Sequence, residues 1–305
     1  MLNSCLLFTT LICDIPKLRL YFWLRNAYIL IGCDILVTKV QSYTKNKNMY
    51  DLLSRQDYLV TQSNDLAKAF GNLTLFEHRL LDYCFSFVQK DDQQEIKYET
   101  TVLDVIRHFG LTASGKTYKM IFKTFQSLMR KTALCLLVQE EDGTSSILMT
   151  GLFQSIKFNE TSKIVFQFNA DVAPYIFQLK SKFYSFRLSE LAVVKSKYTL
   201  TMLKLWNANA YGKWRNYNDP NSLPPSVTIK GTMEEWQTWF LGTDEMGTPR
   251  RWPASRFRQK VLTVALEEIQ SIYKKALVSI TTIKSGRSVV GYEVSINIVN
   301  THLIM

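Results

Sequence analysis

Apolar residues after position 74 recur with the spacing of amphipathic helices. Thr74 precedes Glu77 by three positions, the signature of a capping box, and the apolar positions that follow predict a helix to about Gln89. The same spacing predicts a second helix over Thr101–Phe109, and Gly110 ends it as a C-terminal cap would. Two short helices joined by a polar turn are therefore expected at the start of the periodic sequence.

A third helix, capped by Ser114 and running to about Lys131, has two unlike faces. The face predicted to be buried contains Tyr118, Ile121, Phe122, Phe125, Leu128 and Met129. The opposite face carries Lys116, Lys119, Lys123, Gln126 and Arg130. A solvated surface usually mixes both signs of charge, so a purely cationic stripe indicates contact with an anionic partner.

Alternating apolar and polar residues then predict strands at Ile96–Tyr98, Leu134–Gln139, Ser146–Phe158 and Lys163–Phe168. Helices followed by a β-hairpin are typical of a winged helix-turn-helix domain. The β-rich segment Ile147–Phe168 also offers an edge on which two copies of the chain could pair.

The second half repeats this plan. Its predicted helices are Leu188–Val194, Tyr198–Asn209, Thr232–Leu241 and a long helix from a Ser255 cap to about Lys275. Gly212–Pro225 and Gly242–Pro253 are predicted loops, and Leu277–Ile283 with Val289–Val299 is predicted to form a closing hairpin. Asp171–Arg187 is predicted to be a helical or extended connector. The expected fold class is α+β, with two tandem winged helix-turn-helix domains joined by a short connector.

Two windows of the sequence contain basic residues and no acidic ones, and they indicate a function. Val105–Gln139 holds six Lys/Arg and no acid, and Met246–Leu266 holds five Lys/Arg and no acid. A helix lying against DNA must exclude carboxylates and offer cations to phosphates and bases. The two acid-free windows, rather than the net charge of +11 alone, predict a protein that binds DNA at two places.

The distribution of charge suggests three segments. Residues 1–48 have a net charge of +4, residues 49–180 of −1 and residues 181–305 of +8. We predict that 49–180 is a first winged-helix domain for dimerisation and DNA backbone contacts, and that 181–305 supplies the main sequence-specific binding. Residues 1–48 are interpreted as a nonessential extension before a working start at Met49; the alternative is a weak membrane or partner-binding segment.

Catalytic and metal chemistry find little support in the sequence. Gly110–Thr117 matches the pattern of a phosphate-binding P-loop, but a predicted helix precedes it where the motif needs a strand. The five cysteines are scattered, and the three histidines are far apart, so neither a zinc site nor a DNA-nicking histidine pair is expected. No enzymatic activity and no cofactor are predicted, and the cysteine pattern favours a reducing cytoplasm.

Three stretches together resemble the iteron-type plasmid replication initiators, the Rep family built from two winged helices. The stretches are Val60–Leu66 with Asn72–Leu81, Leu191–Tyr198 with Leu203 and Leu205, and Phe257–Leu262 with Glu268–Ile269. The resemblance covers roughly residues 55–300 in the family's order, whereas the first 48 residues have no counterpart.

The resemblance implies a function without an enzymatic step. Such proteins bind repeated origin DNA (iterons) as monomers, with both recognition helices in successive major grooves. As homodimers, paired through the first domain, they repress their own promoter and so contribute to plasmid copy control. They open the origin and recruit host replication proteins, here expected to be the replicative helicase and the host initiator, in the bacterial cytoplasm.

Carried onto this chain, the resemblance places the second-domain DNA contacts at Arg250, Arg251, Ser255, Arg256, Arg258, Gln259 and Lys260. Arginine or lysine would read guanine, and Gln259 would read adenine. In the first domain, phosphate contacts are expected mainly from Lys116, Thr117, Lys119 and Lys123, and Arg130 is also expected to bind DNA. Two interpretations of Lys195 and Lys197 stay open: contacts to phosphates, or solvated lysines beside a core Tyr198.

Two other functions compete with initiation. One is a winged-helix transcription regulator without an initiation role, which would bind a single palindrome rather than tandem direct repeats. The other is a P-loop enzyme that uses Lys116, which would hydrolyse ATP and lose that activity in Lys116→Ala.

Overall fold

The computed structural model describes residues 59–63, 66–89, 92, 95–140, 142–177, 183–210, 225–244 and 248–298. All of them belong to the compact unit Ser54–Met305. The predicted N-terminal extension, the proposed start at Met49 and nearly all of the predicted loop Gly212–Pro225 lie outside the described residues.

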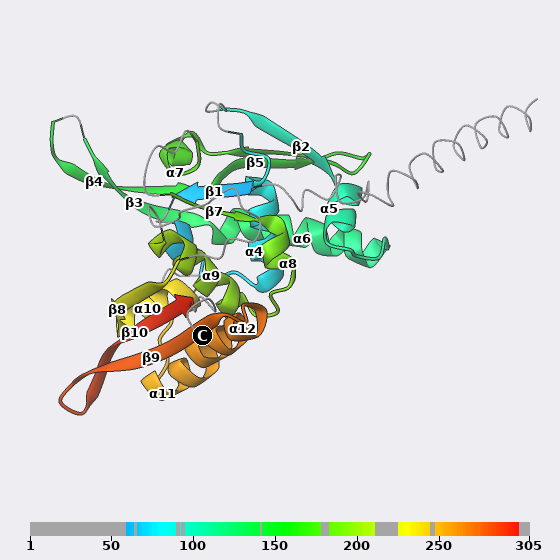
Figure 1. The fold of residues 1–305 in the computed structure, drawn as a ribbon. Helices are drawn as coiled ribbons and strands as arrows, with labels where there is room; N and C mark the ends of the chain where they lie inside the picture. Colours follow the sequence, from blue (N-terminus) through cyan, green and yellow to red (C-terminus); the bar gives the residue numbers. More distant parts are fainter. Residues whose placement is uncertain are drawn as a thin grey trace, which may run out of the picture. The chain divides into compact units, whose positions relative to one another are not determined.

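Three capped helices form the helical part of the first half, as Figure 1 shows: α4 (Leu75–Phe85), α5 (Val102–His108) and α6 (Gly115–Lys131). The predicted capping box is present, because Thr74 N donates to Glu77 Oε2 at 2.6 Å and Glu77 N donates to Thr74 Oγ1 at 3.3 Å. Ser114 caps α6 through a 3.2 Å bond from Thr117 N, as predicted. Helix α4 ends at Phe85, one turn before the predicted end.

The strands of the first half form two small antiparallel sheets. One has the order β2-β6-β5 and the other pairs β3 with β4. Their bounds are β2 (Lys97–Thr101), β3 (Ala133–Gln139), β4 (Ser145–Gly151), β5 (Phe153–Phe158) and β6 (Lys163–Phe168).

The prediction of one strand over Ser146–Phe158 is wrong, because the segment divides at Leu152. This side chain is fully buried, and its backbone N–H donates to the Thr132 carbonyl at 3.0 Å while its own carbonyl accepts from Asn169 N at 2.9 Å. The backbone groups of Leu152 thus bond outside the strand ladders. The segments on either side continue in separate sheets.

A further strand pair joins segments that are far apart in the sequence. Strand β1 (Leu59–Ser63) pairs antiparallel with β7 (Phe183–Arg187), and no strand was predicted at β1 from the sequence. The short helices η1 (Leu66–Lys68), η2 (Ala170–Val172) and α7 (Ala173–Ile176) flank this pair in the sequence. The predicted domain boundary between residues 180 and 181 falls in a stretch outside the described residues and stays a prediction.

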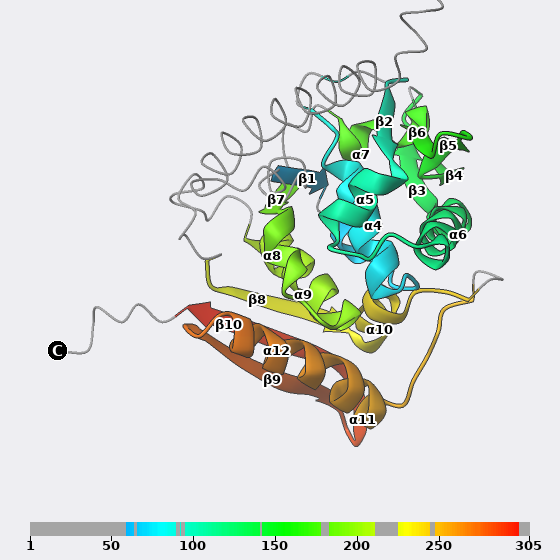
Figure 2. The ribbon, with the colours of Figure 1, turned by 90° about the vertical axis from the view of Figure 1, so that its right-hand side faces the viewer.

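The second half contains a three-stranded sheet of order β8-β10-β9 with helices beside it (Figure 2). Its elements are α8 (Leu188–Ala192), α9 (Lys197–Asn209), β8 (Val227–Thr232), α10 (Met233–Leu241), α11 (Ala254–Phe257), the π-helical segment η3 (Arg258–Thr263), α12 (Val264–Ile272), β9 (Ala276–Ser285) and β10 (Ser288–Ile298). The predicted closing hairpin is confirmed. Strand β8, which pairs with β10, was not predicted.

The long helix of the second half, formed by α11, η3 and α12, starts and ends differently from its prediction. Pro253 rather than Ser255 occupies the N-cap position, no side chain caps the helix, and the helix ends at Ile272. Proline suits this boundary because its ring fixes φ and it lacks an N–H. Ser255 therefore lies within the first turn.

The π-helical segment has a visible origin in the sequence. Buried apolar residues recur every four positions, at Phe257, Val261, Ala265 and Ile269. An α-helix turns about 100° per residue, so a four-residue repeat drifts by about 40° at each step. A π turn holds more residues per turn and reduces this drift. It thereby keeps the apolar positions on the buried face and leaves Arg258, Gln259 and Lys260 exposed.

Candidate nucleic-acid interface

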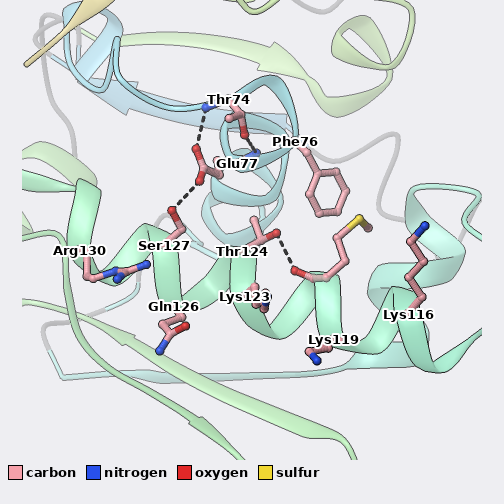
Figure 3. Close-up of a pocket in the computed structure, with 11 residues that line it drawn as sticks. Thr74, Phe76, Glu77, Lys116, Lys119, Lys123, Thr124, Gln126, Ser127 and Arg130 are labelled. Carbon is pink, nitrogen blue, oxygen red and sulfur yellow. Dashed lines mark hydrogen bonds between the residues drawn. The ribbon is translucent and has the colours of Figure 1, made fainter. Parts of the chain in front are cut away.

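Helix α6 presents the predicted cationic stripe. Lys116, Lys119, Lys123, Gln126 and Arg130 are exposed and line one groove with residues at the start of α4. Figure 3 shows these side chains along a single side of the helix, below Thr74, Phe76 and Glu77. The structure thus brings together every first-domain site residue except Thr117, whose hydroxyl donates to the Thr112 carbonyl at 2.7 Å.

A buried acid fixes this helix in place. Ser127 Oγ donates to Glu77 Oε1 at 2.5 Å, and Lys131 Nζ lies 2.9 Å from the same oxygen. Burial alone raises the pKa of Glu77, but bonds from Ser127, the Thr74 amide and Lys131 together lower it below its usual value. Glu77 therefore stays ionised, orients α6 on α4 and engages Lys131.

The predicted buried face of α6 is too wide. Ile121, Phe125 and Leu128 are buried as predicted, but Tyr118, Phe122 and Met129 are 36%, 49% and 40% exposed. The reason is that α4, α5 and β5 cover only part of the helix surface, and the Phe122 ring only partly packs on Phe158, 5.1 Å away. By helical spacing these apolar residues form a strip beside the cationic stripe.

The second cationic group lies at the start of the long helix in the second half. Arg250, Arg251, Ser255, Arg256, Arg258, Gln259 and Lys260 are all exposed. Their surroundings differ, however. Arg251 forms an ion pair with Glu234 at 2.8 Å, whereas the Arg256 guanidinium lies over the Trp252 ring at 4.3 Å from its centroid.

Two charged side chains hold the turn between α8 and α9 by hydrogen bonds, and neither role was predicted from the sequence. Arg79 Nη2 donates to the carbonyls of Leu191, Ala192 and Val194. From the other side, Glu268 accepts bonds from the amides of Lys195 and Ser196 at 2.6 and 3.1 Å and from the Thr199 hydroxyl. The turn that carries Lys195 is therefore fixed by α4 and α12 at once.

Lys195 and Lys197 occupy unlike positions. Lys195 is exposed, but Lys197 is partly buried and its Nζ donates to the Gly71 carbonyl at 2.8 Å. The Lys197 side chain lines a cleft with Lys131, Arg130 and Arg250. Burial, followed by the charges of Arg250 and Lys131, lowers the pKa of Lys197 to about 8.

This pKa predicts a pH dependence of stability. Between the folded pKa of about 8 and the ordinary value of 10.5, the unfolded chain binds more protons at Lys197 than the folded chain. The free energy of unfolding contributed by this residue therefore rises with pH through that window. Wild type should gain stability relative to Lys197→Met between about pH 7 and about pH 10, measured by urea unfolding. A difference that stays constant over this range would contradict the prediction.

The same region contains a close approach of two backbones. A Cβ added at Gly71 would lie 2.6 Å from the Trp239 carbonyl oxygen, and one at Gly242 would lie 2.5 Å from the backbone nitrogen of Asn72. Gly242 also has a φ of +64°, which glycine adopts without strain. Glycine thus permits the segment before α4 to contact the end of α10.

The P-loop-like segment has the context predicted for it. Helix α5 precedes Gly110, which has a φ of +60° as the residue after the helix cap, and Gly115 begins α6. A helix rather than a strand therefore leads into the motif. Over the described part of the chain, no helix is long and apolar enough to span a membrane, and no group of three or more His, Cys, Asp or Glu could hold a metal ion.

Two family models together match most of the chain. Residues 59–207 match the family model described as "Initiator Replication protein, WH1", and residues 232–296 match that described as "Initiator Rep protein, WH2". The sequence matches no curated protein.

One solved structure is similar in fold over most of the chain. The crystal structure of Pi initiator protein in complex with iteron DNA is similar to this chain with a TM-score of 0.58 and 14% sequence identity, covering 80% of this chain and 99% of that one. A structure of domains 2 and 3 of RctB matches with a TM-score of 0.36 and 12% identity, covering 78% of this chain and 85% of that one.

Proposed function

The chain belongs to the initiator replication proteins with two winged-helix domains, and from this we propose that it initiates plasmid replication by binding iterons as a monomer. The similar Pi initiator was crystallised with iteron DNA. One observation carries the proposal for this chain itself. The exposed side of α6 and the start of the long helix in the second half, over Ala254–Thr263, each carry several Lys/Arg and no acid.

The residues divide by their surroundings into two proposed roles. Arg256, Arg258, Gln259 and Lys260 are exposed on the helix that we assign to a major groove, where arginine suits guanine and glutamine suits adenine. Lys116, Lys119, Lys123 and Arg130 would neutralise phosphates. Arg251 contributes less in this scheme, because Glu234 already binds its guanidinium.

A footprint at two salt concentrations tests the proposal. The full chain is incubated with DNA flanking its own coding sequence and with random duplex of matched composition. We expect protection of evenly spaced direct repeats, with affinity that falls by a factor of about 10³–10⁵ between 50 and 200 mM salt if six to ten phosphates are contacted. Protection of one palindrome would favour the transcription regulator, and equal affinity for random DNA would overturn sequence-specific binding.

We also propose that the chain represses its own promoter as a dimer formed through the first domain. Ile147 and Met149 on β4 are 69% and 77% exposed, and Cys135 faces Met149 across the β3–β4 ladder. Three neighbouring exposed apolar side chains on a hairpin suit contact with a second copy. Origin opening and recruitment of the host helicase and host initiator, in the bacterial cytoplasm and without an enzymatic step, complete the proposal.

Charged substitutions on this hairpin test dimerisation. Because burying each apolar side chain is worth about 1.5–3 kcal/mol, Ile147→Asp/Met149→Asp should weaken self-association at least about tenfold in sedimentation equilibrium. The control Leu277→Asp/Val290→Asp changes two exposed apolar residues of the β9–β10 hairpin and should leave self-association unchanged. An equal effect of both pairs would contradict a dimer through the first domain.

A further inference from the structure

Trp252 precedes Pro253, the N-cap residue of the long helix in the second half. Its side chain is partly buried, and its ring lies under the exposed guanidinium of Arg256 at 4.3 Å from centroid to Cζ. This distance is that of a cation–π contact, for which tryptophan is the most favourable ring. The position of the ring is in turn fixed by hydrogen bonds to the Trp252 backbone.

Gln237 holds the backbone of Trp252 at both of its polar groups. Gln237 Nε2 donates to the Trp252 carbonyl at 2.7 Å, and Trp252 N donates to Gln237 Oε1 at 2.8 Å. The Gln237 side chain on α10 is only 1% exposed, so both bonds are shielded from competing water. Displacing Trp252 would leave two buried polar groups without these bonds.

The helix that carries Arg256 is fixed independently. Tyr292 Oη donates to the Ala254 carbonyl at 2.8 Å, and the Tyr292 ring stacks on Phe257 with centroids 6.1 Å apart. Both partners of the cation–π contact, the ring and the helix start, are thus attached to the core.

A stacked guanidinium is well suited to reading a base. Stacking uses the face of the group and leaves its N–H edges available for two parallel bonds to guanine O6 and N7. Arg251 provides the contrast, because its Nη2 donates to Glu234 and its Nη1 to Thr238. An arginine that is already oriented also loses less side-chain entropy on binding.

We propose that Trp252, held by Gln237, is a positioning residue that orients Arg256 for guanine recognition. The inference rests on the proposed function, since it concerns the same DNA-binding site. It assigns base selection to Arg256 and not to Arg251, and it makes Trp252 a determinant of specificity that does not itself need to touch DNA.

A double-mutant cycle tests the coupling. Binding to the duplex protected by wild type and to a random duplex of matched composition is measured for the full-length wild type, Trp252→Leu, Arg256→Ala, the double variant and Trp252→Phe. We expect Trp252→Leu to reduce the preference for the protected duplex about two- to fivefold, the range of an exposed cation–π contact. In the Arg256→Ala background the same change should have no further effect. Trp252→Phe, which keeps a ring, should restore most of the preference.

The outcomes separate this inference from the proposed function. If Trp252→Leu costs the same preference with and without Arg256, or if Trp252→Phe fails as Trp252→Leu does while both melt like wild type, the positioning role is overturned and DNA binding stands. If wild type itself shows no preference for any duplex, the proposed function falls and this inference falls with it. Replacing the contacted guanine by 7-deazaguanine should cost affinity in wild type and not in Arg256→Ala.

Discussion

Replacing Arg256 and Arg258 together by alanine should remove most of the chain's preference for its own DNA repeats. Both side chains are exposed on the helix assigned to the major groove, and this helix carries no acid before Glu267. Each arginine that bonds a guanine contributes about 1–3 kcal/mol of discrimination, so losing both should reduce the preference at least about 30-fold. Competition binding between the protected duplex and random DNA measures this ratio directly.

Lys274→Ala/Lys275→Ala is the matched control for this experiment. These lysines are exposed just after α12. Their replacement removes two positive charges, as many as the replacement of the arginine pair. The control should lower affinity for all DNA modestly and leave the preference intact, since phosphate contacts do not discriminate sequence. If both pairs reduce the preference equally, the helix start acts only through its charge and does not read bases.

Replacing Lys204 by methionine should have the largest effect on stability. Its Nζ lies 2.7 Å from Asp82 Oδ1, and the two side chains are only 6% and 0% exposed. Removing one partner of a buried ion pair leaves a charge without its counterion and typically costs about 3–5 kcal/mol. Because native domains are stable by only about 5–15 kcal/mol, Lys204→Met should unfold at much lower urea concentration than wild type.

The double variant Asp82→Asn/Lys204→Met shows whether the charge itself causes the loss. Once both charges are removed, much of the stability should return, because the cost of burying a carboxylate that has lost its lysine disappears. Lys274→Met, on the surface, should change stability by less than about 0.5 kcal/mol. A Lys204→Met chain within about 1 kcal/mol of wild type would show that the pair contributes little to the fold.

This pair matters for function through the helix that carries it. Helix α9 contacts both α4 and α12, and Figures 1 and 2 show it between them. The turn that leads into α9 is hydrogen-bonded to the same two helices, through Arg79 on α4 and Glu268 on α12. Polar contacts thus link α9 and the turn before it to α4, which packs against α6, and to α12. We expect this link to set the spacing between the two cationic helices.

Much of the helical framework was predictable from the sequence, because its signals are local. Thr74 with Glu77, and Ser114 with Thr117, form caps within three positions of one another, so these helix starts were correct. The closing hairpin β9–β10 turns through Gly286 with a φ of +58°, a conformation that the Ser285-Gly286 dipeptide favours. The exposed cationic stripe of α6 followed from helical periodicity alone.

What the tertiary structure decided depends on contacts between distant residues. Strand β1 is a strand because β7 supplies its hydrogen bonds, and α6 exposes Phe122 because its neighbours cover less of the helix than its apolar stripe demands. In the same way, only the tertiary structure shows that Arg251 forms an ion pair with Glu234, that Lys197 donates to the Gly71 carbonyl and that Arg256 lies over the Trp252 ring. A sequence specifies which side chains carry charge and which helix faces they share, but the partner of each charge is fixed by packing across elements.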